Sequence, residues 1–136
     1  MRISVFALIV TGLLLSSMGC SKYEENSFIS LRSKAGRLDN EWSLVMVKQN
    51  NIEVTQHYGD DYGYKFDRNG SYRHIENETS IVGTWEFNDD KTEIRLTEPD
   101  SPTPRVFKIL KLTNRALWWQ LQGVPDEYIQ HFEQKK

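Results

Sequence analysis

Apolar residues recur at every second position in a series of short segments, and this period limits the fold more than any other feature. No window shows a sustained apolar period of 3.6 residues. Glycine, asparagine, aspartate and proline separate the segments, as is typical of turns. The pattern predicts about eight antiparallel strands joined in sequence by short loops. The segments span residues 41–48, 52–56 (the weakest), 62–67, 71–76, 81–88, 92–98, 105–113, 116–122 and 127–133.

The same alternation predicts which side chains face inward. In segment 41–48, Trp42, Leu44 and Met46 share one face. In segment 92–98, Ile94 and Leu96 face inward between polar neighbours. The predicted inner face is rich in aromatic residues: Trp42, Tyr64, Phe66, Tyr72, Trp85, Phe87 and Trp119.

Two segments allow more than one interpretation. The parity of the apolar residues changes within 105–113, which indicates a β-bulge near Ile109 or burial on both faces. Residues after Pro125 fit either a short helix or a strand. We expect a strand, because a lone two-turn helix is marginal and a strand would pair with 116–122.

Eight strands are enough to close a small barrel, which leaves no sheet edge exposed. We therefore expect an all-β domain that forms a small antiparallel up-and-down β-barrel. A sandwich of two sheets is the competing architecture.

The first twenty residues predict a secretion signal. Arg2 precedes an apolar stretch, residues 3–15, that is shorter than a typical membrane-spanning helix. Small and flexible residues then lead to Cys20, the single cysteine of the chain. This arrangement resembles a lipoprotein signal, in which the cysteine is acylated after cleavage. An ordinary signal peptide and an uncleaved membrane anchor are the alternatives.

The signal divides the chain into three expected parts. Residues 1–19 would be the signal peptide, and residues 20–36 a polar tether that begins at lipidated Cys20. Residues 37–136 would be the barrel. We expect the lipid to anchor the protein at the outer membrane, on its periplasmic or its surface side.

Four segments, in order along the chain, resemble a known family. They are LDNEW at 38–42, YKFDRNGSY at 64–72, GTWEFNDDKT at 83–92 and ILKLTNRALW at 109–118. Residues 37–136 resemble the lipocalin-like domains of small lipoproteins from Bacteroidota-type bacteria. The resemblance implies an up-and-down β-barrel and no shared catalytic residues. One departure is Asn40, which stands where the family usually has glycine, two residues before its tryptophan.

The sequence gives little support for catalysis, metal binding or nucleic-acid binding. His57, His74 and His131 are far apart along the chain, and two Asp-Asp pairs lie at predicted turns. There is no nucleophile elbow and no glycine-rich phosphate loop. With 17 basic and 19 acidic residues, the formal net charge is −2, which does not suit a nucleic-acid-binding protein. We expect no enzyme, no cofactor and no metal site.

The aromatic inner face has two interpretations: a packed core, or the lining of a cavity with tyrosine hydroxyls that orient a ligand. In the second case the barrel binds a small apolar or amphipathic molecule. The candidate ligand-binding residues are Trp42, Tyr64, Tyr72, Trp85 and Trp119.

A different hypothesis makes the protein an accessory subunit of a cell-envelope complex. Trp118 alternates with its neighbours and should point outward, where Phe28 or Leu31 of the tether could cover it. Uncovered, Trp118 could contact a protein partner. The candidate partner surface is thus Trp118, Phe28 and Leu31. An enzyme would instead require His74 and an acid to converge in a cleft.

Overall fold

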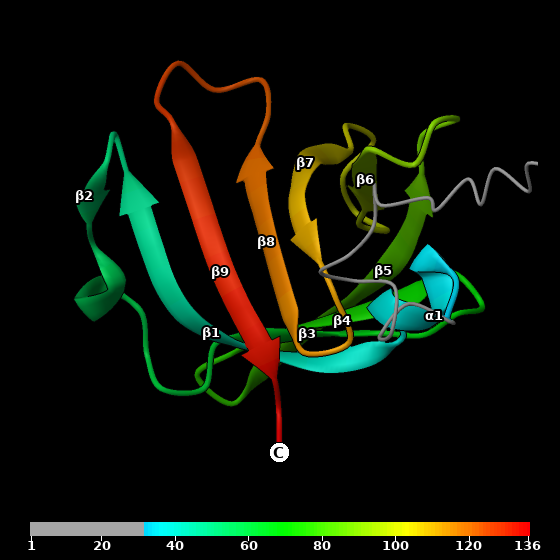
Figure 1. Ribbon diagram of the computed structural model, residues 1–136, viewed down its shortest axis with the longest axis horizontal. Coiled ribbons are helices and arrows are strands. Elements are labelled where there is room, and N and C mark those ends of the chain that lie inside the picture. The colour runs from blue at the N-terminus through cyan, green and yellow to red at the C-terminus, as the bar shows by residue number, and fades with distance from the viewer. Residues whose placement is uncertain (1–31) are drawn as a thin grey trace, which may run out of the picture.

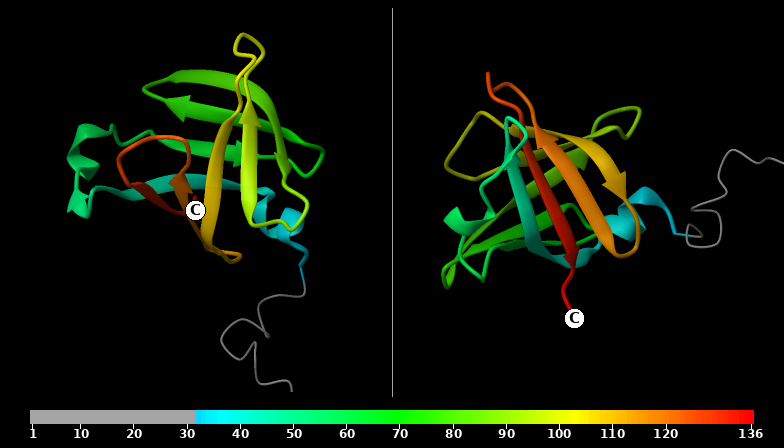
Figure 2. Two further views of the ribbon diagram at one scale, coloured as in Figure 1. Left: turned by 90° about the horizontal axis from the view of Figure 1, so that it is seen from above. Right: turned by 60° about the vertical axis from the view of Figure 1, so that its left-hand side comes forward.

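Nine strands form one antiparallel sheet that closes on itself (Figures 1 and 2). They are seen in a computed structural model that describes residues 32–136. The elements are α1 (Lys34–Leu38), β1 (Asn40–Gln49), β2 (Ile52–Glu53), the 3₁₀ helix η2 (Thr55–His57), β3 (Gly63–Phe66), β4 (Ser71–Glu76), β5 (Thr79–Phe87), β6 (Glu93–Thr97), β7 (Arg105–Leu112), β8 (Ala116–Leu121) and β9 (Tyr128–Gln134).

The sheet has the order β2-β1-β3-β4-β5-β6-β7-β8-β9, and β1 also pairs with β9. This last pairing closes eight strands into an up-and-down barrel, and β2 is an extra short strand beside β1. The expected barrel is therefore confirmed, and the two-sheet sandwich is excluded. Closure satisfies the backbone groups that an open sheet would leave at its two edges.

Several of the hairpin turns contain residues with positive φ angles. Gly70, in the β3–β4 turn, has a φ of +97°. The two-residue β4–β5 turn consists of Asn77 and Glu78, whose φ angles are +48° and +68°. Two successive positive φ angles match the twist of the flanking strands.

Two β-bulges change the parity of the inner face. The bulge predicted in β7 is confirmed, since the register with β8 shifts between Ile109 and Lys111. A second bulge lies in β1, where the register with β9 shifts between Leu44 and Met46. The prediction that Met46 faces inward is therefore wrong. The extra residue moves Met46 to the outer face and buries Val47 completely.

The C-terminal segment is a strand, as expected, and its inward residues include Gln130 and Phe132. It pairs with β8 on one side and with β1 on the other. The strand is favoured over a helix because it supplies backbone partners to both neighbours.

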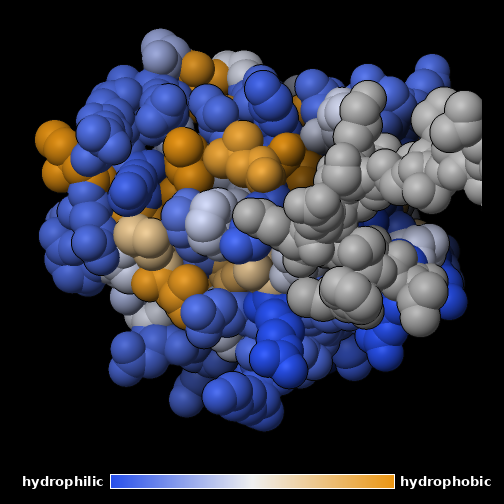
Figure 3. All heavy atoms as spheres, in the orientation of Figure 1, coloured by the Kyte–Doolittle hydropathy of each residue, from blue (hydrophilic) through white to orange (hydrophobic). Residues whose placement is uncertain are grey.

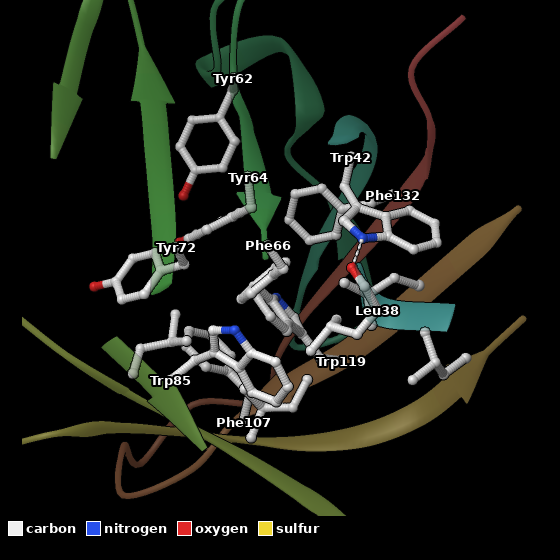
Figure 4. Packing of buried hydrophobic residues seen from close by; sticks show 14 residues of the cluster. Leu38, Trp42, Tyr62, Tyr64, Phe66, Tyr72, Trp85, Phe107, Trp119 and Phe132 are labelled. Carbon is white, nitrogen blue, oxygen red and sulfur yellow. Dashed lines mark hydrogen bonds between the residues drawn. The ribbon is translucent and has the colours of Figure 1, made fainter. Parts of the chain in front are cut away.

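Helix α1 lies at the end of the barrel that is remote from the β8–β9 loop (Figure 1). Its Leu38 is fully buried, and the Trp42 indole N–H donates to the Leu38 carbonyl at 3.1 Å (Figure 4). Arg37 donates to the carbonyl of Leu112 in β7 at 3.0 Å. The expected tether extended to residue 36, and no helix was predicted here. Its five residues are too few for a helical period to show.

The part of the barrel between Tyr64 and helix α1, here termed the lower barrel, is filled by aromatic rings that touch one another. Trp119 stacks on Phe107 with ring centroids 4.2 Å apart, and Tyr64 lies edge-on to Trp119 at 5.0 Å. Phe66, Trp119 and Phe132, which Figure 4 shows in this part of the barrel, are fully buried, so the rings leave little room there. Within residues 32–136, no helix is long and apolar enough to cross a membrane.

Candidate ligand site at the barrel mouth

The five predicted ligand-binding residues all lie inside the barrel, and each is at most 8% exposed. Trp42 and Trp119, at 1% and 0%, belong to the packed core and offer a ligand no free surface. Trp85 packs edge-on against Phe66, and its indole N–H donates to the Asp67 carbonyl at 2.8 Å. Tyr64 and Tyr72 differ from these, because their hydroxyls point toward a polar region of the interior.

This region, here termed the inner polar cluster, consists of Tyr64, Tyr72, His74, Arg105 and Glu98. Its residues come from β3, β4, β7 and the position that follows β6. In β3, β4 and β7, the alternation of the pleat directs the side chains of the cluster inward. The imidazole of His74 stacks on the Tyr64 ring, with centroids 4.4 Å apart. Arg105 forms an ion pair with Glu98, with Nη2 and Oε1 3.2 Å apart.

Three polar atoms of the cluster are buried without a well-formed hydrogen bond: Tyr64 Oη, Tyr72 Oη and His74 Nε2. Arg105 lies near both hydroxyls and Tyr62 lies near that of Tyr64, but none of these contacts has the geometry of a good bond. A buried polar group without a partner costs free energy, so most such groups are paired. Three in one place indicate a region that can form further hydrogen bonds with a ligand.

The electrostatic environment of the cluster is set by burial and by Arg105. Burial raises the pKa of Tyr64 well above its usual value, and Tyr62 nearby adds to this effect. Burial also raises the pKa of Tyr72, while Arg105 opposes the shift. Burial, and then the charge of Arg105, lower the pKa of His74 to about 4. At neutral pH the cluster therefore holds two neutral phenols and a neutral imidazole beside the Arg105–Glu98 ion pair.

A second polar group crosses the interior next to the cluster, and its hydrogen bonds are made. Gln130 accepts from the Trp119 indole N–H at 2.8 Å and donates to Tyr62 Oη at 3.3 Å. Its amide also lies 3.4 Å from Tyr128 Oη, which in turn contacts the hydroxyl of Tyr58. This connected chain holds one side of the mouth in place.

An open hollow of about 280 Å³ lies at the mouth, lined by His74, Glu76, Asn77, Thr79 and Ile81. His74 lines the hollow and also stacks on Tyr64, so the hollow borders the inner polar cluster at His74. Glu76 also lines it. No hydrogen bond joins Glu76 to His74 in the described structure, so the two are not held as a base and its orienting acid.

Trp118 points outward, as predicted. It is half-buried because His131 of β9 stacks on it, with centroids 4.1 Å apart and planes within 6°. The Lys111 ammonium of β7 lies 4.4 Å from the Trp118 ring centroid. Since β9 and β7 flank β8, these neighbours approach the ring from opposite sides. Both restrict its contact with a partner.

The outer wall around Trp118 exposes apolar side chains as well. The bulges in β1 and β7 present Val45 and Leu110, which are 43% and 42% exposed. Figure 3 shows apolar side chains gathered on the face where β8 and β9 lie in Figure 1. Lys48 and Lys111 lie close to His131, and after burial their charges lower its pKa further.

Three candidate residues, Cys20, Phe28 and Leu31, lie outside the described residues. Their predicted roles in lipidation and in covering Trp118 stay predictions. In the part of the chain that the structure describes, no three His, Cys, Asp or Glu residues are grouped as a metal ion would require.

Sequence reasoning missed Arg105, the cation at the centre of the inner polar cluster. A signal was present, because Arg105 has the same parity as Phe107 on the inner face. A cationic side chain at an inward position of a strand is rare enough to mark a site.

Known proteins give no direct guide to the role of this site. The chain matches no family model, and no curated protein is similar to it in sequence. The function is therefore inferred from the barrel and its mouth.

Proposed function

We propose that this chain is a lipid-anchored, lipocalin-like protein of the outer membrane that binds a small amphipathic ligand at the barrel mouth. The observation that supports it most is the inner polar cluster. Three buried polar atoms without good partners lie beside a cation and next to an open hollow. A ligand could supply the missing hydrogen bonds.

The filled lower barrel limits the size and depth of the ligand. The core aromatics Trp42, Phe66 and Trp119 are at most 1% exposed, so a long molecule has no channel through the barrel. We propose binding without catalysis, since the cluster contains no nucleophile activated by a neighbouring base. The ligand would touch Tyr64, Tyr72 and His74 from the mouth.

The anchor can be tested by fractionation. The variant Cys20→Ser should lose lipid attachment and leave the washed membrane fraction as a soluble or unprocessed protein. Membrane fractionation identical to the wild type would contradict the anchor. Serine is the matched replacement, because it keeps the size of the side chain and removes the thiol.

Ligand binding can be tested on the natively processed protein, purified in mild detergent and measured by native mass spectrometry. We expect a bound small molecule that organic extraction removes and that the variant Tyr72→Phe retains less well. Unliganded protein in every preparation, together with no mass shift on incubation with envelope lipid extract, would overturn the binding proposal.

The accessory-subunit hypothesis is supported by one observation, the exposure of Val45 and Leu110 on the wall that also carries Trp118. It predicts that a stoichiometric envelope protein co-purifies in a pull-down and is lost from the variant Leu110→Lys. The matched control is Val82→Lys, because Val82 is 53% exposed on β5. Equal recovery by both variants would remove this wall as the interface.

A further inference from the structure

We infer that the inner polar cluster is a site for the carboxylate of a small monocarboxylic acid. The carboxylate would accept hydrogen bonds from Arg105, Tyr64, Tyr72 and His74. This inference rests on the proposed function and names the chemical class of its ligand.

The groups of the cluster that lack a partner can act as hydrogen-bond donors. Tyr64 Oη and Tyr72 Oη are hydroxyls that can donate, and a neutral His74 can carry its proton on Nε2. Arg105 adds N–H groups that cannot accept. A ligand that offers only acceptor atoms can satisfy all four side chains at once. A carboxylate does this with two oxygens.

The positive charge of Arg105 also favours a carboxylate. Its side chain is 37% exposed and its ion-pair partner Glu98 is 30% exposed, so the pair lies at the boundary between the interior and the mouth. Glu98 contacts one terminal nitrogen, Nη2. The guanidinium has five N–H groups, so it can bind a second carboxylate without giving up the first.

Two acidic residues, Glu98 and Glu76, limit the negative charge that the ligand can have. Glu98 and Glu76 both stand at the mouth, and Glu76 lies near enough to Tyr58 to raise its pKa after the effects of burial and of Tyr62. Glu98 already pairs with the guanidinium and Glu76 lines the hollow, and these two carboxylates disfavour a ligand with two negative charges. The site therefore suits a monocarboxylate better than a phosphate monoester.

The volume of the hollow limits the size of the ligand. The hollow beside His74 measures about 280 Å³ and includes the apolar side chain of Ile81, which is 43% exposed. This volume is at the lower end of the range for small-molecule sites. With its carboxylate on the cluster, the ligand would place a short alkyl chain along Ile81, because the aromatic core fills the barrel below.

The test compares an acid with its alcohol on the mature chain, residues 20–136, with Cys20→Ser so that no detergent is needed. The probes are octanoate and octan-1-ol, titrated by isothermal calorimetry. We expect octanoate to bind roughly tenfold or more tightly than octan-1-ol, since hydrogen bonds to charged groups are worth more than neutral ones. The variant Arg105→Gln should abolish the preference, because it should weaken octanoate binding by far more than octan-1-ol binding.

Arg95→Gln is the matched control, because Arg95 is exposed and forms an ion pair with Glu86 at 3.3 Å on the outer wall. It should keep the preference for octanoate. If Arg105→Gln fails to fold, Tyr72→Phe decides the question, since it removes one donor and keeps the ring. We expect it to weaken octanoate severalfold and octan-1-ol by less, because a hydrogen bond to a charged acceptor is stronger than one to a neutral acceptor.

The outcomes separate this inference from the proposed function. Equal binding of both probes, unchanged in Arg105→Gln and Tyr72→Phe, overturns the carboxylate site and leaves a binding barrel. Failure of octanoate to bind at millimolar concentration also overturns it. If native mass spectrometry of the processed protein then shows a different bound molecule, the binding proposal survives; if it shows none, both fail.

Discussion

Two buried polar residues of the barrel, Gln130 and Tyr72, are accommodated in different ways. Gln130 is 2% exposed, and its amide group bonds to Trp119 on one side and to Tyr62 on the other. Tyr72 is 1% exposed, and its hydroxyl has no well-formed bond. The first arrangement stabilises the fold, while the second leaves a buried hydroxyl without a good partner, as the proposed ligand site requires.

This difference predicts opposite effects of removing a hydroxyl. Tyr72→Phe should leave the free energy of unfolding of the ligand-free protein unchanged or raise it, because the lost group has no good partner. Tyr62→Phe should lower it by about 1 kcal/mol, because Gln130 loses a hydrogen-bond partner. Urea unfolding of both variants measures this. A larger loss for Tyr72→Phe than for Tyr62→Phe would mean that the hydroxyl is satisfied in solution.

His74 should make the stability depend on pH. Its pKa is about 4 in the folded protein, against an unperturbed value near 6.5, because burial and Arg105 oppose its charge. Between these values the unfolded chain binds the additional proton. Stability from this group is therefore complete above pH 6.5 and is lost as the pH falls toward 4. The midpoint temperature of thermal unfolding should fall less steeply from pH 7 to pH 4 for His74→Gln than for the wild type. Parallel curves for the two proteins would contradict this role of His74.

At the scale of elements, the tight hairpins show where the backbone is held against its preference. In the two-residue β4–β5 turn, Glu78 has a φ of +68°, a region that glycine adopts freely and other residues adopt at a cost. The turn geometry is imposed by the pairing of β4 with β5, whose register continues to Glu76 and Thr79.

Glu78→Gly should therefore raise the free energy of unfolding by about 0.5–1 kcal/mol. The control is Asp89→Gly in the β5–β6 turn, where the φ of Asp89 is not positive. The control should lower stability slightly, because glycine adds conformational entropy to the unfolded chain. Chemical denaturation of the two variants gives the comparison, and the prediction fails if both variants are destabilised alike.

At the scale of the whole molecule, the barrel is closed in two ways. The β1–β9 pairing joins the ends of the sheet, and α1 covers one end of the barrel with Leu38. The other end stays open at the hollow beside His74. The domain thus has one sealed, apolar end and one polar end that is open at the hollow.

The sealed end predicts a large effect at Leu38. Leu38→Ala should cost about 2–4 kcal/mol, because it opens a cavity over Trp42 in the fully buried core. Leu110→Ala is a matched control, since the same atoms are removed from a side chain that is 42% exposed, and it should cost much less. Calorimetric unfolding of both variants tests this, and similar losses would show that α1 does not close the barrel in solution.

The sequence by itself determined the elements and most of the inner face. A two-residue period can be read locally, so it predicted the paired parity of Tyr64 and Phe66, the bulge in β7 and the strand at 127–133. The barrel followed from the number of strands and from short connections. These features depend on neighbours along the chain, which the sequence shows directly.

Only the tertiary structure decided the rest, because it depends on residues that are distant in sequence. The bulge at Val45 reflects the register of β1 with β9, more than 80 residues later, and no local pattern marks it. The helix α1 forms against a barrel end that exists only after folding. Arg105 meets Tyr64 and Tyr72 because closure brings β7 across from β3 and β4. The candidate site is a product of barrel closure, which a linear pattern of apolar residues does not contain.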